Sequence, residues 1–237
     1  MNYLYLLLNL GSLSVPFIFS FHPKLKFYKL WKPLFIGILT SMLIFIPWDI
    51  LFTKEGIWGF NNDYFLGIKF FLLPIEEWLF FICIPYACAF THYALLYYFP
   101  SLKLSKRITK TISYFLILLF IILSSYHYNK WYTFINFTLA SILIMIVINK
   151  NLNLLSHFYL TFLVMLIPFF IVNGILTGSF VENEVVWYNN LENLNIRVFT
   201  IPIEDIIYAF TLILLNLFVM TLLETKNKLP RDKPTKY

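Results

Sequence analysis

Two pairs of adjacent acids, each directly after Pro-Ile and directly before an apolar run, have the residue types and spacing that most suggest chemistry. Glu76 and Glu77 stand in LLPIEEWLFF, and Glu204 and Asp205 stand 128 residues later in TIPIEDIIYAF. Ionisable groups in apolar membrane sequence are costly and usually functional. A protonated carboxyl group beside an ionised one is the usual arrangement for acid/base catalysis. The repeated motif therefore predicts a carboxyl-based acid/base site.

The same residues also suit the start of a helix. Proline is favoured at the first helical position, and acids in the first turn complement the helix dipole. Because adjacent residues point about 100° apart on a helix, we expect one acid of each pair to face a bundle interior and the other to face loop residues. Repetition of the motif in related contexts favours a functional role over helix capping alone.

Transmembrane helices are the elements that must position these acids. Of the 237 residues, 60% are hydrophobic and 13% are charged, against about 25% charged in ordinary soluble domains. This composition excludes a disulfide-stabilised secreted protein, a disordered chain and a cytosolic enzyme. It predicts an all-α polytopic membrane protein with about seven spans of the roughly 20-residue length that a bilayer requires: 3–21, 33–52, 70–99, 111–127, 131–149, 154–176 and 199–223. The third run is long enough to tilt or to begin as an interfacial turn, and the short fourth run leaves six spans as the alternative.

The positive residues indicate the topology. With seven spans, four of the 18 Lys and Arg residues fall on one side, namely Lys54, Lys69, Lys130 and Arg197, and fourteen fall on the other. Positive residues concentrate in cytoplasmic loops, so the N-terminus is expected outside and the C-terminus in the cytoplasm. This distribution explains the net charge of +6 without a nucleic-acid partner.

Related polar sequences also precede the two acidic motifs, which indicates an internal repeat. WGFNN (58–62) comes before the first motif and WYNN (187–190) before the second. We expect two parallel three-helix repeats, over residues 1–99 and 131–224, joined by a linking helix within 100–130 and followed by a mobile cytoplasmic tail over 225–237. Parallel repeats place both motifs at the same side of the membrane, around one shared cavity.

Polar and aromatic residues near the motifs are candidates for a substrate-binding pocket. The set is Trp48, Asp49, Trp58, Asn61, Trp78, Phe80, Asn173, Trp187, Asn189, Arg197 and Tyr208. Aromatic faces stabilise cations, although rings of this kind also form interfacial belts. The asparagines also suit loop caps. Arg197 lies five residues before Pro202, where it can pair with Glu204 or Asp205, although topology and snorkelling alone also explain it. No glycine-rich nucleotide fingerprint and no metal-ligand spacing of His or Cys occurs, so we expect neither a cofactor nor a metal.

These elements resemble the lycopene cyclase domain family of integral-membrane carotenoid cyclases. The resemblance covers both halves of the chain: PWDILFTKEGIWGFN (47–61), LPIEEWLFF (73–81), NGILTGSF (173–180), VVWYNN (185–190) and IRVFTIPIEDIIYAF (196–210). The chain looks like the form in which two halves are fused. The resemblance implies cyclisation of the ψ-ends of lycopene to β-rings, through γ-carotene to β-carotene, by a lyase-type isomerase.

The resemblance also implies the roles and surroundings of the site. It implies Glu76 and Glu204 as the principal acid/base pair, with Glu77 and Asp205 supporting them or exchanging roles. The reaction is a net isomerisation that needs no electron donor, which agrees with the expected lack of a cofactor. Lycopene, the lipid bilayer of a bacterial inner membrane and other enzymes of carotenoid biosynthesis are the implied partners.

A transporter that uses the same carboxylates as a binding or proton site is the alternative function. Parallel repeats suit a transporter, but the acids lie near the starts of the spans rather than at midspan. A retinal-binding protein needs a Schiff-base lysine, and the last span, 199–223, contains none. The ring type, the substrate length and the number of cyclised ends stay open at this point.

The topology predicts that a reporter fused after Tyr237 stays in the cytoplasm. An enzyme that folds only outside the cytoplasm, such as alkaline phosphatase, is therefore expected to be inactive at this position and a fluorescent protein to be bright. The reverse pattern would contradict the seven-span topology.

Overall fold

The computed structural model describes residues 2–227, and the part of the predicted tail after residue 227 lies outside the described residues. Within this range the chain forms seven α-helices: α1 (Leu4–Phe19), α2 (Trp31–Lys54), α3 (Ile75–Tyr98), α4 (Lys106–Tyr126), α5 (Trp131–Lys150), α6 (Leu152–Leu176) and α7 (Ile203–Asn227). Six of them are long and apolar enough to cross a membrane, including the fourth run, the weakest of the predicted spans. Helix α1, which corresponds to the predicted first span over 3–21, is a shorter apolar helix. The seven-span count therefore stays a prediction. The chain is therefore an all-α polytopic membrane protein, as predicted.

The predicted weak fourth span is a full helix of 21 residues, and Ser105 caps its start by accepting a hydrogen bond from the N–H of Ile108. The long third run, in contrast, begins as a turn. Residues 69–74 form a hairpin of β2 (Lys69–Phe70) and β3 (Leu73–Pro74), and the helix starts at Ile75. The prolines of the two motifs thus precede the first helical residue rather than occupying it.

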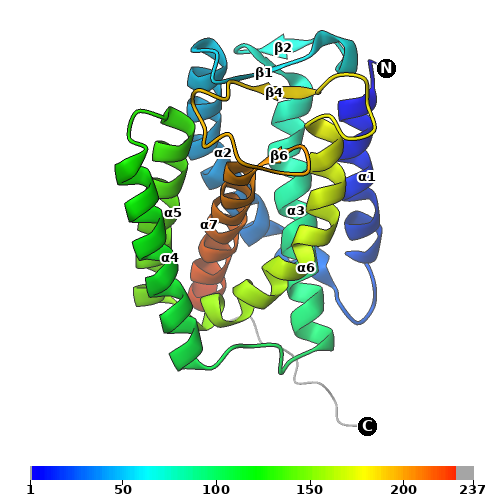
Figure 1. Cartoon of the computed structure of the whole chain (residues 1–237). Coiled ribbons are helices and arrows are strands. Elements are labelled where there is room, and N and C mark those ends of the chain that lie inside the picture. Colours follow the sequence, from blue (N-terminus) through cyan, green and yellow to red (C-terminus); the bar gives the residue numbers. More distant parts are fainter. Residues whose placement is uncertain (1, 228–237) are drawn as a thin grey trace.

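All the strands lie at one end of the bundle, the upper end in Figure 1. Besides β2 and β3 they are β1 (Trp58–Phe60), β4 (Val186–Tyr188), β5 (Arg197–Val198) and β6 (Ile201–Pro202). β1 pairs antiparallel with β4, which joins the loops of the two repeats, and β5 forms a hairpin with β6. The strands therefore close the bundle over the starts of α3 and α7.

The two repeats run in the same direction and agree in backbone detail. α3 and α7 both begin at the upper end (Figure 1), and each follows a two-stranded hairpin. Left-handed backbone occurs at Gly67 and Phe71 in the first repeat and, 128 residues later, at Asn195 and Phe199 in the second. This correspondence supports a parallel duplication, with α4 between the two copies.

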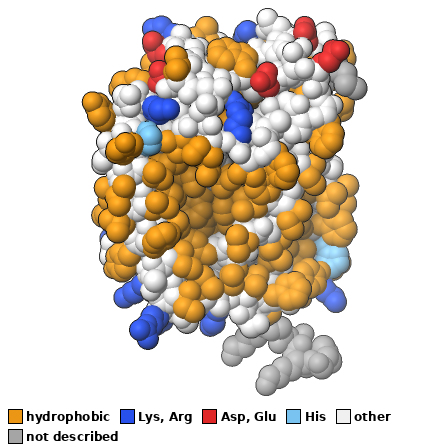
Figure 2. Space-filling view, in the orientation of Figure 1, with side chains coloured by type: hydrophobic (Ala, Val, Ile, Leu, Met, Phe, Trp, Pro, Cys, Tyr) orange, Lys and Arg blue, Asp and Glu red, His pale blue; other side chains and the backbone are white. Residues whose placement is uncertain are grey.

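Side-chain chemistry divides the molecule along its long axis. Figure 2 shows a band of apolar side chains, hollowed near its middle, with charged side chains at both ends. The lower end carries lysines and arginines, whereas acids and bases are mixed at the upper end (Figure 2). This arrangement matches the side-to-side asymmetry read from the sequence, and the orientation of the two ends in a membrane stays a prediction.

The two repeats do not pack against each other symmetrically. The second helix of the first repeat, α2, packs closely along α7, the third helix of the second repeat. The equivalent pair with the repeats exchanged, α6 and α3, makes far fewer contacts. Gly37 of α2 allows the close approach, since a Cβ atom there would lie 2.9 Å from the backbone oxygen of Asn216 in α7. The looser side leaves space between α3 and α6.

Replacing Gly37 by leucine is expected to destabilise the protein, because overpacked interiors lose about 1–3 kcal/mol. The measurement is thermal unfolding of the purified protein in detergent. Gly11→Leu is the matched control, since a Cβ atom at Gly11 meets nothing within 4 Å. Equal unfolding temperatures for Gly37→Leu and the wild type would contradict the close packing of α2 on α7.

Candidate active site

Each acidic motif sits where a hairpin turns directly into a helix. The N–H of Ile75 donates to the carbonyl oxygen of Ile68 at 2.9 Å, and the N–H of Ile203 donates to that of Ile196 at 3.0 Å. These bonds fold the preceding loop back over the first helical turn. The two acids of each motif then have different neighbours, one in the loop and one in the bundle.

The first acid of each pair binds the loop. Glu76 accepts a hydrogen bond from the N–H of Leu66 at 2.8 Å, and Glu204 accepts one from the N–H of Leu194 at 2.7 Å. The hydroxyl of Thr133 also donates to Glu204, at 2.7 Å. Both glutamates are fully buried. The expected principal pair therefore lies against the loops, at the closed end of the bundle.

The second acid of each pair faces the bundle interior. The hydroxyl of Tyr5 donates to Glu77. Asp205 accepts three hydrogen bonds: from the hydroxyl of Tyr132 at 2.6 Å, the side-chain amide of Asn173 at 2.8 Å and the hydroxyl of Tyr188 at 2.9 Å. Donors to a carboxylate stabilise its charged form. Asp205 thus has many more stabilising contacts than Glu77.

Helices α1 and α5 supply equivalent donors, which the sequence analysis missed. Besides the tyrosines, Asn9 donates to the backbone oxygen of Glu76 at 2.8 Å, and Asn136 donates to that of Glu204 at 2.7 Å. Tyr5 and Asn9 have the same spacing as Tyr132 and Asn136. This repeated Tyr-x-x-x-Asn pattern is the feature of the sequence from which the four donors could have been predicted.

Asp49 is a third acid of the site. It is buried, and its Oδ1 accepts a hydrogen bond from the indole N–H of Trp58 at 2.6 Å. Its Oδ2 is buried without a hydrogen-bond donor, and the carboxyl group of Asp49 interacts with the side chains of Glu77 and Thr53. Two adjacent buried carboxylates repel each other, and a shared proton relieves the repulsion.

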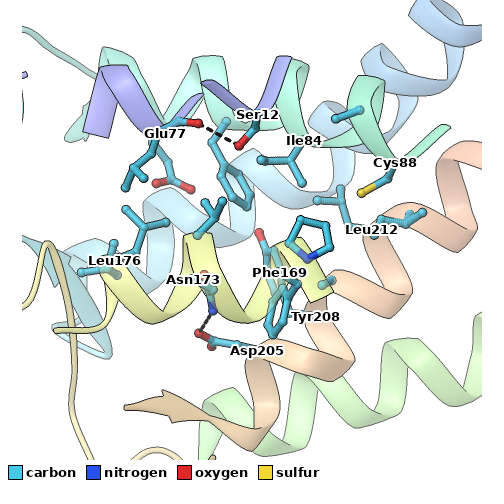
Figure 3. Close-up of a pocket in the computed structure, with 18 of the residues that line it drawn as sticks. Ser12, Glu77, Ile84, Cys88, Phe169, Asn173, Leu176, Asp205, Tyr208 and Leu212 are labelled. Carbon is cyan, nitrogen blue, oxygen red and sulfur yellow. Dashed lines mark hydrogen bonds between the residues drawn. The ribbon is translucent and has the colours of Figure 1, made fainter. Parts of the chain in front are cut away.

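A single cavity of about 530 Å³ brings the inner acids of both repeats together. Asp49, Glu77 and Asp205 line it, and Glu76 and Glu204 do not. Figure 3 shows Glu77 and Asp205 on opposite walls, while Ile84, Cys88 and Leu212 continue the cavity away from them. The cavity is thus polar where the acids lie and apolar along the rest of its length.

The structure divides the other expected pocket residues into two groups. The cavity is lined by Trp58, Phe80, Asn173 and Tyr208. Trp48 lies behind this wall and packs against the ring of Tyr208 at 5.2 Å. Trp78 donates to the backbone oxygen of Phe70, and Trp187 is 41% exposed. These three tryptophans do not line the cavity.

The remaining polar candidates support the loops. Asn61 and Asn189 each accept a hydrogen bond, at 3.1 Å, from the backbone N–H two residues later, as loop caps do. Arg197 donates to the backbone oxygen of Thr200 at 2.6 Å and to Asn190 at 3.0 Å. The expected pairing of Arg197 with Glu204 or Asp205 is therefore wrong, because the guanidinium group is held across its own hairpin.

Tyr188 connects the β1–β4 strand pair to the site. Burial, followed by the nearby charge of Asp205, raises the pKa of the Tyr188 hydroxyl well above its usual range. The hydroxyl therefore keeps its proton and donates it to Asp205 in a hydrogen bond. The same ring lies parallel to that of Tyr132, at 5.9 Å between centroids. Strand β4 thus adds a donor that the sequence analysis did not identify.

In a comparison with protein families, residues 2–96 and 129–223 match a family described as lycopene cyclase. The first matched range covers α1, α2 and nearly all of α3, and the second covers α5, α6 and most of α7, whereas α4 lies outside both. No curated protein and no solved structure matches the chain.

Proposed function

The chain belongs to the lycopene cyclase family, and we propose that it closes the ψ-ends of lycopene into β-rings by acid/base catalysis without a redox step. A carboxylic acid protonates the terminal C1=C2 double bond at C2. The C5=C6 double bond attacks the resulting cation at C1 and closes a six-membered ring. A carboxylate then removes a proton from C6, which leaves the double bond of the β-ring.

One observation carries the proposal: carboxyl groups from both repeats line a single cavity that is otherwise mostly apolar. Glu77 comes from the first repeat and Asp205 from the second, and they stand on opposite walls (Figure 3). A general acid and a general base must both reach the reacting atoms. A polyene end that lies between the two walls has one carboxyl group on each side.

The hydrogen bonds support different roles for the two acids. Asp205 accepts three hydrogen bonds, which favour a carboxylate, so we assign it as the base that removes the proton from C6. Glu77 lies beside the carboxyl group of Asp49, and this pair is assigned as the source of the proton for C2. Glu76 and Glu204 hold the loops and act as positioning residues.

Aromatic rings beside the acids support a cationic intermediate. Trp58, Phe80, Tyr132 and Tyr208 line the cavity. The ring of Tyr208 is itself held by Phe45 at 5.0 Å and by Trp48 at 5.2 Å. The negative face of an aromatic ring stabilises a cation by about 2 kcal/mol in a site without water. Such a wall also keeps water away, which would otherwise capture the cation.

Glu77→Gln and Asp205→Asn are each expected to lower ring formation roughly 100- to 10,000-fold, the usual loss when a general acid or base is removed. The measurement is chromatography of pigments from a lycopene-accumulating host, with the amount of membrane-inserted protein determined by immunoblot.

Glu76→Gln and Glu204→Gln are the matched controls, because each removes a neighbouring acid that does not line the cavity. They are expected to lose less activity than the inner-acid variants at equal protein level. Normal ring formation by both inner-acid variants would refute the assignment, and loss only in the two controls would restore Glu76 and Glu204 as the principal pair.

Tyr208 tests the role of the aromatic wall. Tyr208→Leu removes the ring and is expected to slow ring formation roughly 30-fold, the equivalent of about 2 kcal/mol. Tyr208→Phe keeps the ring and is expected to retain most of the activity. Equal rates for the two variants, measured with purified protein and lycopene, would show that the ring does not stabilise the reaction.

A further inference from the structure

The cavity wall includes side chains that also lie on the outer surface of the bundle. Leu7 lines the cavity and is 60% exposed. Gly11 and Pro168 line it too, and both are exposed. Leu7 and Gly11 belong to α1 and Pro168 belongs to α6, two helices that make few contacts with each other. Residues that face both the cavity and the outside mark an opening between α1 and α6.

The opening has room because its edge carries small or rigid residues. A Cβ atom at Gly11 would meet no atom within 4 Å. Ser12, the next residue, turns its hydroxyl onto the backbone oxygen of Leu8 at 2.7 Å. Its polarity is therefore satisfied within the helix, and the opening presents an apolar edge.

The depth of the opening places it within the apolar band. Gly11 is seven residues into α1 from Leu4, and Pro168 is eight residues before Leu176, where α6 ends. At a rise of about 1.5 Å per residue, both lie roughly 10–12 Å from the upper ends of their helices. Gly11 lies six residues after Tyr5, which bonds Glu77. Pro168 lies five residues before Asn173, which bonds Asp205. At about 3.6 residues per turn, the opening is roughly one and a half turns deeper than the acids.

The surface around the opening is apolar on both helices. Leu10 and Val15 of α1 are 47% and 58% exposed, and Leu163, Ile167 and Ile171 of α6 are 61%, 65% and 62% exposed. Helix α1 contains no acidic or basic residue. A surface of this kind at this depth faces hydrocarbon rather than water.

Resting on the proposed function, we propose that the carotenoid reaches the acids sideways from the bilayer, through the opening between α1 and α6 that Leu7, Gly11 and Pro168 border. One end of the polyene passes Gly11 and moves upward to Glu77 and Asp205. Because the three cavity acids gather in one part of the cavity, only one end of a linear substrate meets them at a time. The second end must use the same opening after the first ring has formed.

The test narrows the opening without touching the acids. Gly11→Trp and Leu7→Trp place a large ring at its edge, and each is expected to lower kcat/KM for lycopene supplied in lipid vesicles by about tenfold or more. The single-turnover rate of ring closure for lycopene that is already bound is expected to stay within about twofold of the wild type, because the acids are unchanged. Ring formation by the purified protein is followed by chromatography.

Two controls separate the opening from the helix as a whole. Gly11→Ala removes the glycine but keeps the opening, and Leu10→Trp adds the same ring on the exposed residue before Gly11, which does not line the cavity. Both are expected to keep the wild-type kcat/KM. Unchanged kcat/KM in Gly11→Trp and Leu7→Trp, an equal loss in Leu10→Trp, or a loss of the single-turnover rate with unchanged kcat/KM would each overturn the lateral opening. A wild-type protein that forms no ring would instead overturn the proposed function.

Discussion

Carboxyl groups inside an apolar bundle are stable only where hydrogen-bond donors surround them or a neighbour shares a proton. In this protein that requirement organises the upper end of the molecule. Tyr5 of α1 and Tyr132 of α5 reach the inner acids of α3 and α7. Loop N–H groups satisfy the outer acids. The positions of the first and fifth helices, the hairpins and the strand pair are all tied to these few carboxyl groups.

In the described part of the chain, the inner acids of the two repeats share one cavity. Both repeats carry an inner acid that accepts a hydrogen bond from a tyrosine. The second helix of each repeat places a different side chain next to this acid. Asp49 of α2 places a second carboxyl group beside Glu77, whereas Asn173, at the corresponding place in α6, donates to Asp205. The two similar inner acids thus have unlike surroundings. Acid and base roles require such a difference.

The asymmetric packing of the repeats has a similar consequence. Gly37 lets α2 lie against the backbone of α7. In α6 the corresponding residue is Thr161, which stands twelve residues before Asn173 as Gly37 stands twelve before Asp49. The hydroxyl of Thr161 forms a hydrogen bond with Nδ1 of His92 at 2.8 Å. One interface between the repeats is therefore closed and the other is open enough to hold a cavity. Two identical interfaces would give either two cavities or none.

Sequence by itself determined the all-α membrane class and the two acidic motifs, because apolar runs and the spacing of 128 residues between the motifs are countable along the chain. It predicted about seven spans and two repeats. It also indicated that the two acids of a pair face different surroundings, since helix geometry separates adjacent residues. The choice between them depended on tertiary structure. In the structure the cavity is lined by Glu77 and Asp205, whereas the loops are bound by Glu76 and Glu204. The angle between each hairpin and its helix determines this difference, and the angle cannot be read from residue types. The same reason explains why Trp78, Trp187 and Arg197 look like pocket residues in the sequence yet lie outside the cavity. Which side chains share a space is decided by packing between distant segments, and only the folded chain contains that information.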